Sequence, residues 1–104
     1  MAIAQVTIVP IGTGSTSLSG YVAELHRILE QERSSVRYEL TPMSTIIEGD
    51  WEDILRVVRQ MHESPFLQGA QRVSTTITID DRRDKAASMK QKLESVEQKL
   101  HTRR

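Results

Sequence analysis

The sequence predicts an α+β fold, in which a four-stranded antiparallel sheet is covered on one face by two helices. Two observations predict it: apolar residues change regularly between strand and helix periodicity, and the resulting segments follow the order β-α-β-β-α-β. The size of the chain agrees with this fold, because 104 residues suit one domain with a single modest core. We therefore expect residues 1–104 to form one domain, in which a further helix follows the last strand.

The first strand and the first helix are predicted by their different periodicities. Apolar and polar residues alternate through residues 3–11, which indicates a strand. Residues 18–29 then carry apolar side chains at helical spacing. Ser17 or Ser19 is suited to cap this helix, because a serine hydroxyl accepts from the first unpaired backbone N–H groups.

A turn separates the second and third strands. Residues 36–41 alternate between apolar and polar side chains, and Pro42 marks a bend because its φ is fixed and it has no N–H group. Residues 44–48 are rich in β-branched residues and predict a short strand. Gly49 lets the backbone bend after it, and Asp50 is a good N-cap for the next helix.

The second half is predicted to hold a helix, a strand and a last helix. The second helix begins at Trp51 and is expected to stop before Pro65, with His62 and Glu63 capping or solvating its end. Residues 72–80 alternate as a fourth strand, and a last helix is expected from about residue 84 to residue 101. That helix has a narrow apolar seam, which fits packing against another subunit. The seam consists of Ala86, Met89, Leu93, Val96 and Leu100.

This order of elements is that of the ferredoxin-like fold. Right-handed crossovers give the spatial strand order 4-1-3-2, with all neighbours antiparallel and both connecting helices on one face. The other face is bare and mostly polar, so it is either solvated or available for self-assembly. Its predicted side chains are Gln5, Thr7, Arg37, Glu39, Ser74, Thr76 and Thr78.

Composition argues against several classes of function. The 14 basic and 14 acidic residues cancel, and neither central strand carries an aromatic residue, so RNA or DNA binding is not expected. There is no cysteine, the three histidines lack metal-ligand spacing, and no catalytic triad or P-loop motif occurs. No apolar run approaches membrane-spanning length. We expect a cytoplasmic, non-enzymatic protein with no metal, no cofactor, no membrane partner and no nucleic-acid partner.

Two groups of polar residues are candidates for a ligand site. Hydroxyl-bearing residues gather where the first strand ends and the third and fourth begin, beside Arg72, and they suit a small polar ligand or an anion. They are Thr13, Ser15, Ser17, Ser44 and Thr45, and they equally suit ordinary turns and caps.

Glu48 is the second candidate, as an acidic residue in an otherwise apolar and hydroxyl-bearing strand. Its alternative role is a surface carboxylate paired with Lys or Arg. Strand rise separates Glu48 from Ser44 by about 10 to 13 Å.

Three segments of the chain carry a family resemblance. They are IVPIGT at residues 8–13, PMSTIIEGDW at residues 42–51 and RVSTTITIDDRRDK at residues 72–85. Together they resemble the small thiamine-binding-protein family, the one-domain relatives of the YkoF-like proteins. The resemblance covers nearly the whole chain and departs from the family's usual pattern at Ser44, where the family has glycine.

The resemblance implies a ferredoxin-like fold and homo-oligomers, here expected to be a homotetramer built as a dimer of dimers. It also implies binding of thiamine or its hydroxymethylpyrimidine moiety. In that hypothesis Glu48 accepts from the pyrimidine amine and Thr45 or a loop hydroxyl meets a ring nitrogen, while Tyr21 or Trp51 contacts the ring face. The alternative is a ligand-sensing regulatory or structural oligomeric module that binds another small polar metabolite or an anion.

Overall fold

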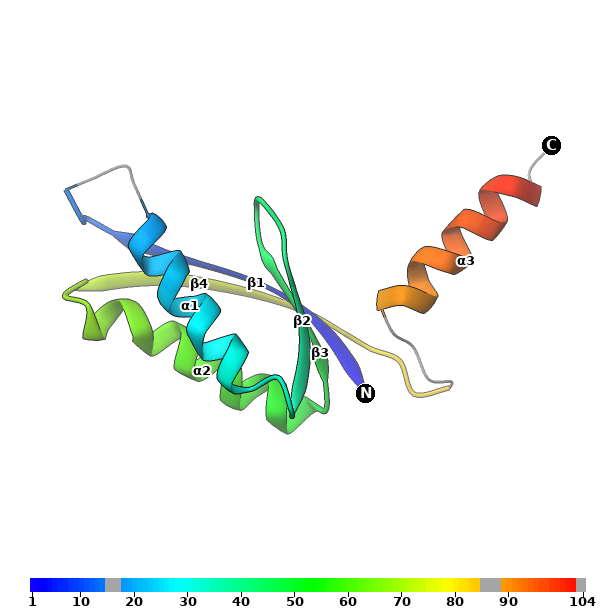
Figure 1. Cartoon of the computed structure of the whole chain (residues 1–104), viewed down its shortest axis with the longest axis horizontal. Helices are drawn as coiled ribbons and strands as arrows, with labels where there is room; N and C mark the ends of the chain where they lie inside the picture. The colour runs from blue at the N-terminus through cyan, green and yellow to red at the C-terminus, as the bar shows by residue number, and fades with distance from the viewer. Residues whose placement is uncertain (15–17, 85–88, 103–104) are drawn as a thin grey trace.

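A computed structural model describes residues 1–14, 18–84 and 89–102, and it has the predicted order of elements (Figure 1). The sheet order is β2-β3-β1-β4, with every neighbouring pair antiparallel, which confirms the predicted ferredoxin-like topology. The elements are β1 (Ala2–Ile11), α1 (Ser19–Gln31), β2 (Val36–Leu40), β3 (Thr45–Gly49), α2 (Trp51–Leu67), β4 (Arg72–Asp81) and α3 (Met89–Thr102).

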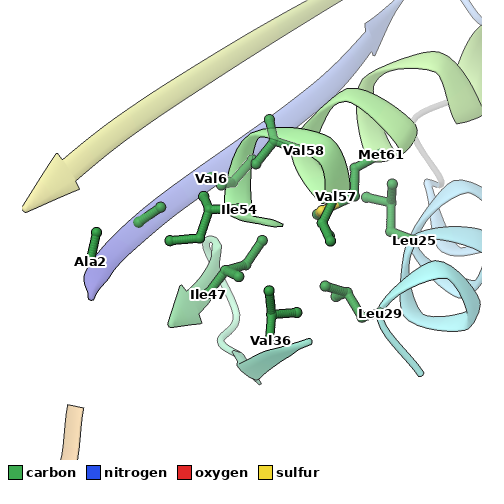
Figure 2. Close-up of a cluster of buried hydrophobic side chains, with 11 residues drawn as sticks. Ala2, Val6, Leu25, Leu29, Val36, Ile47, Ile54, Val57, Val58 and Met61 are labelled. Atoms are coloured by element: carbon green, nitrogen blue, oxygen red, sulfur yellow. The ribbon is translucent and has the colours of Figure 1, made fainter. Parts of the chain in front are cut away.

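The core lies between the sheet and the two helices α1 and α2, which cover the same face (Figures 1 and 2). Alternate residues of each strand point into it, as the period of two requires. It is aliphatic apart from Met61, as the low aromatic content indicates. Its buried members are Ala2, Ala4, Val6, Leu25, Leu29, Val36, Ile47, Ile54, Val57, Val58 and Met61. The other face of the sheet is covered by neither α1 nor α2.

The turn between β2 and β3 is closed by Thr41 and Ser44. The backbone N–H of Thr41 donates to the Ser44 carbonyl at 2.9 Å, and the Ser44 N–H donates to Thr41 Oγ1 at 3.0 Å. Both residues therefore belong to the turn, and β2 ends at Leu40 while β3 begins at Thr45. Each boundary lies one residue inside the predicted strand.

Helix ends differ from the sequence-based expectation in three places. Leu18, with no side-chain cap bond, is the N-cap of α1, so Ser19 lies inside the helix; Ser17 is outside the described residues. Asp50 does occupy the N-cap of α2, but its side chain makes no capping hydrogen bond. Pro65 lies inside α2, which continues to Leu67. An interior proline loses one helical hydrogen bond, but this one is fully buried in the core and only two helical residues follow it.

His62 and Glu63 lie within α2 rather than beyond its end, so the expectation that they cap it was wrong. His62 instead joins the helix to the sheet, because its Nδ1 lies 2.7 Å from Oγ1 of Thr75 in β4. Its ring also meets that of Phe66 edge to face, with the ring centroids 5.5 Å apart.

Within the described residues the last helix, α3, covers Met89–Thr102, and residues 85–88, between it and β4, lie outside them. Asp84 is not helical and accepts a hydrogen bond from Arg82 Nη2 at 2.9 Å. Figure 1 shows α3 extending away from the sheet and the other two helices. An ion pair between Lys92 and Asp80 connects it to the end of β4.

The apolar seam of α3 is exposed to solvent. Its described members Leu93, Val96 and Leu100 have 69%, 58% and 65% of their surface exposed. Ala86, the first member of the predicted seam, lies outside the described residues. Leu93, Val96 and Leu100 therefore do not pack on the core of their own domain.

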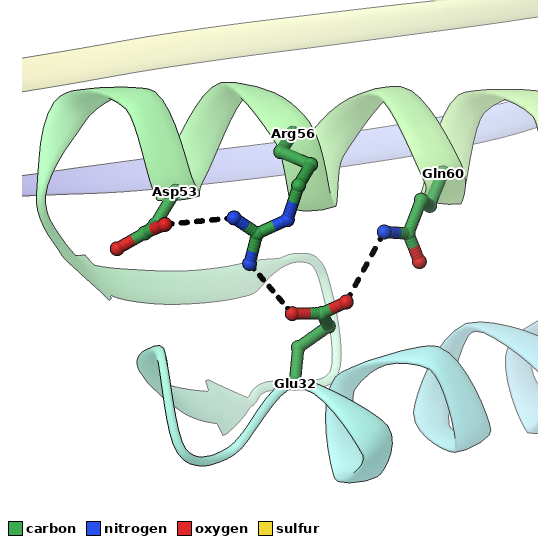
Figure 3. A network of polar contacts seen from close by, with 4 residues as sticks. All are labelled: Glu32, Asp53, Arg56 and Gln60. Carbon is green, nitrogen blue, oxygen red and sulfur yellow. Dashed lines mark hydrogen bonds and ion pairs between the residues drawn. The ribbon is translucent and has the colours of Figure 1, made fainter.

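A polar network fastens α1 to α2 (Figure 3). Glu32, the C-cap of α1, accepts hydrogen bonds from Arg56 Nη2 at 2.7 Å and from Gln60 Nε2 at 3.2 Å. Arg56 also donates to Asp53 at 2.7 Å. The Arg56 guanidinium lowers the pKa of Glu32 below its usual value, and Glu32 in turn raises the pKa of Arg56.

Candidate functional site

Glu48 lies on the side of the sheet that α1 and α2 leave uncovered. Thr45, Ile47 and Gly49 are buried against the helices, so Ile46 and Glu48, at the alternate positions of β3, point the other way. Glu48 is nevertheless only 3% exposed. A carboxylate buried to this degree requires compensating polar interactions, and Glu48 does have one.

The strands on each side place an apolar and a basic residue beside Glu48. Ile3 of β1 is its Cα partner in one direction, and Arg37 of β2 is its partner in the other. Residues directly opposite across antiparallel strands have their Cβ atoms about 4.5 to 5.5 Å apart on the same face. The carboxylate therefore lies between an aliphatic wall and a strand that carries a cation.

Gln5 extends this polar surface toward the β2–β3 turn. Its Cα partner is Ile46, so it lies diagonally beside Glu48 on the uncovered face. Its Nε2 donates to Ser44 Oγ at 3.3 Å. Ser44, Gln5 and Glu48 therefore follow one another across β3 and β1, and we call these three residues the open-face polar strip. The sequence analysis placed Gln5 on this face but did not choose it as a candidate ligand-binding residue. The alternation of apolar and polar residues in β1 already indicated that Gln5 lies on the uncovered face.

Thr45 lies on the opposite side of the sheet from Glu48, which contradicts the expectation that both meet one small ligand. It pairs with the buried Val6 and is itself buried beneath the helices. The neighbouring Ser44 faces the polar strip, because adjacent strand residues point to opposite faces.

The predicted hydroxyl pocket is not assembled as expected. Arg72 does pair with Ile11, so β4 begins where β1 ends. However, Thr45 pairs with Val6, five residues before Ile11, which is about 17 Å at the usual strand rise. Thr13 lies beyond Ile11 and is therefore far from the start of β3, while Ser15 and Ser17 lie outside the described residues.

The aromatic residues considered for stacking belong to the helical side of the sheet. Tyr21 lies in α1, and Trp51 is the first residue of α2, where it is 45% exposed. Glu48 faces the other side of the sheet, so neither ring is placed to cover a ligand bound to its carboxylate within one chain. The expected contact of Tyr21 or Trp51 with the ring of a ligand stays a prediction.

Charged residues near the end of β4 are arranged as local ion pairs. Arg83 Nη2 donates to Asp81 at 2.8 Å, which lowers the pKa of Asp81. Within residues 1–14, 18–84 and 89–102, no cluster of three or more metal-ligating side chains occurs. No helix in the same residues has the length and apolarity needed to cross a membrane.

Fold and site together define a small ferredoxin-like α+β domain with a buried carboxylate on its uncovered sheet face. The chain belongs to the thiamine-binding protein family, whose sequence profile matches residues 4–97. It is 51% identical to the UPF0045 protein YqgV of Bacillus subtilis, over 96% of this chain and 98% of that relative. A UPF0045 protein from the glkA 3' region of Staphylococcus xylosus is 46% identical, over 97% and 96% of the two chains.

Solved structures agree with this membership. Protein MJ1052 of Methanocaldococcus jannaschii is 31% identical, with a TM-score of 0.81 over 92% of this chain and 95% of that one. The DUF77 domain of Bacillus cereus is 26% identical, with a TM-score of 0.77 over 88% and 86% of the two chains. Similarity along nearly the full length indicates that the described fold is that of the family.

Proposed function

We propose that this protein binds thiamine or its hydroxymethylpyrimidine moiety without catalysing a reaction, and that Glu48 is the principal polar contact. The observation that carries the proposal is the nearly complete burial of this carboxylate on the uncovered face of the sheet. Membership of the thiamine-binding protein family supports the choice of ligand.

The open-face polar strip suits the hydrogen-bonding edge of a 4-aminopyrimidine. That edge presents an amine donor beside a ring-nitrogen acceptor, so it needs one acceptor and one donor from the protein. Glu48 supplies the acceptor, and the amide of the diagonally adjacent Gln5 supplies the donor. The ligand amine joins or replaces the interaction that Glu48 already has.

The rest of thiamine is compatible with the same surface. Its thiazolium ring is a cation, which favours a nearby carboxylate, and charge-assisted hydrogen bonds are the stronger kind. Ile3 and Ile46 lie on the same face as Glu48 and provide apolar contact for a flat ring. Arg37, beside Glu48, would favour a phosphate ester of thiamine over thiamine itself, because its guanidinium would pair with the phosphate group.

A second candidate function is a regulatory or structural module that binds another small polar metabolite or an anion. Arg37 beside the polar strip favours this reading if the ligand carries a carboxylate or a phosphate. In both readings we propose self-association into a dimer of dimers, supported by the exposed apolar seam of α3. Packing that seam against a second copy would remove apolar surface from water.

Calorimetric titration of thiamine and of hydroxymethylpyrimidine into wild type and Glu48→Gln tests the proposal. Loss of one hydrogen bond to a charged group costs about 1.5 to 3 kcal/mol, so the affinity of Glu48→Gln should fall by about 10- to 150-fold. Glu39→Gln is the matched control, because Glu39 is an exposed residue of β2 on the same face of the sheet as Glu48. This variant should bind the ligand with wild-type affinity.

Equal affinity of the Glu48→Gln and wild-type proteins would exclude the carboxylate role. If Glu48→Gln unfolds, Glu48→Asp keeps the charge and shortens the side chain, and it should still bind, though more weakly.

A thermal-shift series with thiamine, amino acids and phosphate separates the thiamine-binding function from the regulatory or structural one. A specific ligand stabilises by about 2.7 kcal/mol at one hundred times its dissociation constant.

A further inference from the structure

One row of residues on the uncovered face of the sheet has opposite charges at its two ends. Arg37 of β2 is the Cα partner of Glu48 on one side, and Ile3 of β1 is its partner on the other. Ile3 in turn pairs with Asp80 of β4. Directly paired residues point to the same face of a sheet. The row therefore ends in a cation on β2 and in a carboxylate on β4.

Asp80 already holds a cation in this structure. The Lys92 ammonium of α3 forms an ion pair with Asp80 Oδ2, and both side chains are about half exposed. Ion pairs of this kind contribute little free energy, because water screens them and two long side chains must be ordered. The neighbouring Arg82 and Arg83 bond to other carboxylates. A ligand cation therefore displaces Lys92 from Asp80 at small cost.

We propose that Asp80 is a second binding carboxylate of the thiamine site, on which the thiazolium cation displaces the Lys92 ammonium. The assignment rests on the proposed function, and it adds the direction in which thiamine lies and a group that competes with it. Glu48 keeps its contact with the pyrimidine amine, and Asp80 receives the charge at the other end of the molecule.

Charge decides which way thiamine points along the row. Its two rings are joined by a single methylene group, so with the pyrimidine on Glu48 the thiazolium lies toward β2 or toward β4. On β2 it would meet the guanidinium of Arg37, which has the same charge. On β4 it meets the Asp80 carboxylate. Gln5 favours the second direction, because it belongs to β1, which lies between β3 and β4.

The spacing of the strands suits a ligand of two joined rings. Neighbouring strands are about 4.7 to 4.9 Å apart, so the Cα atoms of Glu48 and Asp80, two strands apart, are separated by about 10 Å. Ile3 lies between them and offers an apolar side chain to the ring faces. A single pyrimidine ring held by Glu48 contacts the first carboxylate alone.

The same row treats thiamine and its phosphate esters differently. A phosphate at the thiazolium end brings negative charge, which Asp80 repels and Arg37 attracts. Binding of the ester should therefore depend on Arg37, whereas binding of thiamine should depend on Asp80.

Calorimetric titration of thiamine and hydroxymethylpyrimidine into Asp80→Asn and Lys92→Met tests the assignment. The expected change is about two- to fivefold, the range for partly exposed ion pairs. Asp80→Asn should bind thiamine more weakly by this factor, and Lys92→Met should bind it more tightly, because the competing ammonium is gone. Neither change should alter the affinity for hydroxymethylpyrimidine, which lacks the thiazolium ring.

Two further measurements act as controls. Asp81→Asn removes the next carboxylate of β4, which points to the helical side beside Ala2, and it should bind thiamine like wild type. Thiamine monophosphate should bind Asp80→Asn no more weakly than wild type. Added sodium chloride should weaken thiamine binding less steeply in Asp80→Asn than in wild type, because screening acts on the charge contact that is lost.

Unchanged thiamine affinity in Asp80→Asn would overturn the assignment of Asp80, and so would equal losses for thiamine and hydroxymethylpyrimidine. Unchanged or weaker thiamine binding by Lys92→Met would overturn the competition. A gain of affinity in Lys92→Met cannot come from loss of folded protein, so the test does not depend on stability. Failure of the proposed function is a separate result, in which Glu48→Gln binds hydroxymethylpyrimidine like wild type. If the wild-type protein binds neither compound, both proposals are wrong.

Discussion

Replacing Gly49 by alanine should destabilise the domain, because β2 approaches this residue closely. An added Cβ would lie 3.1 Å from Val36 Cγ1 and 3.3 Å from the Ser35 carbonyl oxygen, both closer than ordinary van der Waals contact. Gly49 has no positive φ, so the requirement is one of space rather than backbone conformation. The position matters for the site because Gly49 directly follows Glu48.

The expected change follows from two opposing terms. Overpacking in a well-packed core costs about 1 to 3 kcal/mol. Alanine also restricts the unfolded chain, which stabilises the folded protein by about 0.4 to 1 kcal/mol. We therefore expect the free energy of unfolding of Gly49→Ala to be lower than that of wild type by about 1 to 2 kcal/mol.

Urea unfolding at a fixed protein concentration measures this difference. Gly20→Ala is the matched control, because a Cβ there has no atom within 4 Å and the residue is helical, so a gain of roughly 0.5 to 1 kcal/mol is expected. Combining Gly49→Ala with Val36→Ala should cost less than the sum of the two changes, since the clash with Cγ1 disappears. Unchanged or increased stability of Gly49→Ala would refute the reasoning.

Two further predictions concern the core and the network between the helices. Ile47→Ala should lower the free energy of unfolding by about 2 to 5 kcal/mol, whereas Met43→Ala, at a residue 84% exposed, should change it by less than about 0.5 kcal/mol. Comparable urea midpoints for the two variants would contradict the described core. The Glu32 pKa is lowered in the folded protein, so its stabilisation is full above the ordinary glutamate pKa of about 4.3 and is lost as pH falls below it. Glu32→Gln should therefore reduce the acid dependence of stability in that range, and an identical pH profile for variant and wild type would argue against the network.

The order and type of the elements could be predicted from the sequence because they depend on local periodicity. Alternation in residues 3–11 and 72–80 indicated strands, and both were found with ends shifted by no more than one residue. Pro65 was misleading, because its local preference against helix interiors is weaker than the packing of its buried ring at the end of α2. The last helix was expected from about residue 84, but Asp84 itself is not helical and accepts a hydrogen bond from Arg82.

The candidate site was less predictable, because it depends on how strands are aligned. The sequence drew attention to Glu48, and alternation alone would have placed Gln5 on the same face. The hydroxyl pocket required the end of β1 to lie beside the start of β3. However, β1 runs five residues past the Val6–Thr45 pair. Local sequence does not specify this offset.

By itself the sequence determined the secondary structure, the antiparallel topology and the division of each strand into an inner and an outer face. These properties follow from side-chain periodicity and from the short connections between elements. Only the tertiary structure decided that Glu48 is buried on the uncovered face, that Thr45 lies beneath the helices, and that β4 forms an edge of the sheet. Burial and register depend on which segments, distant along the chain, come to lie side by side. Local periodicity carries no information about how such segments pair.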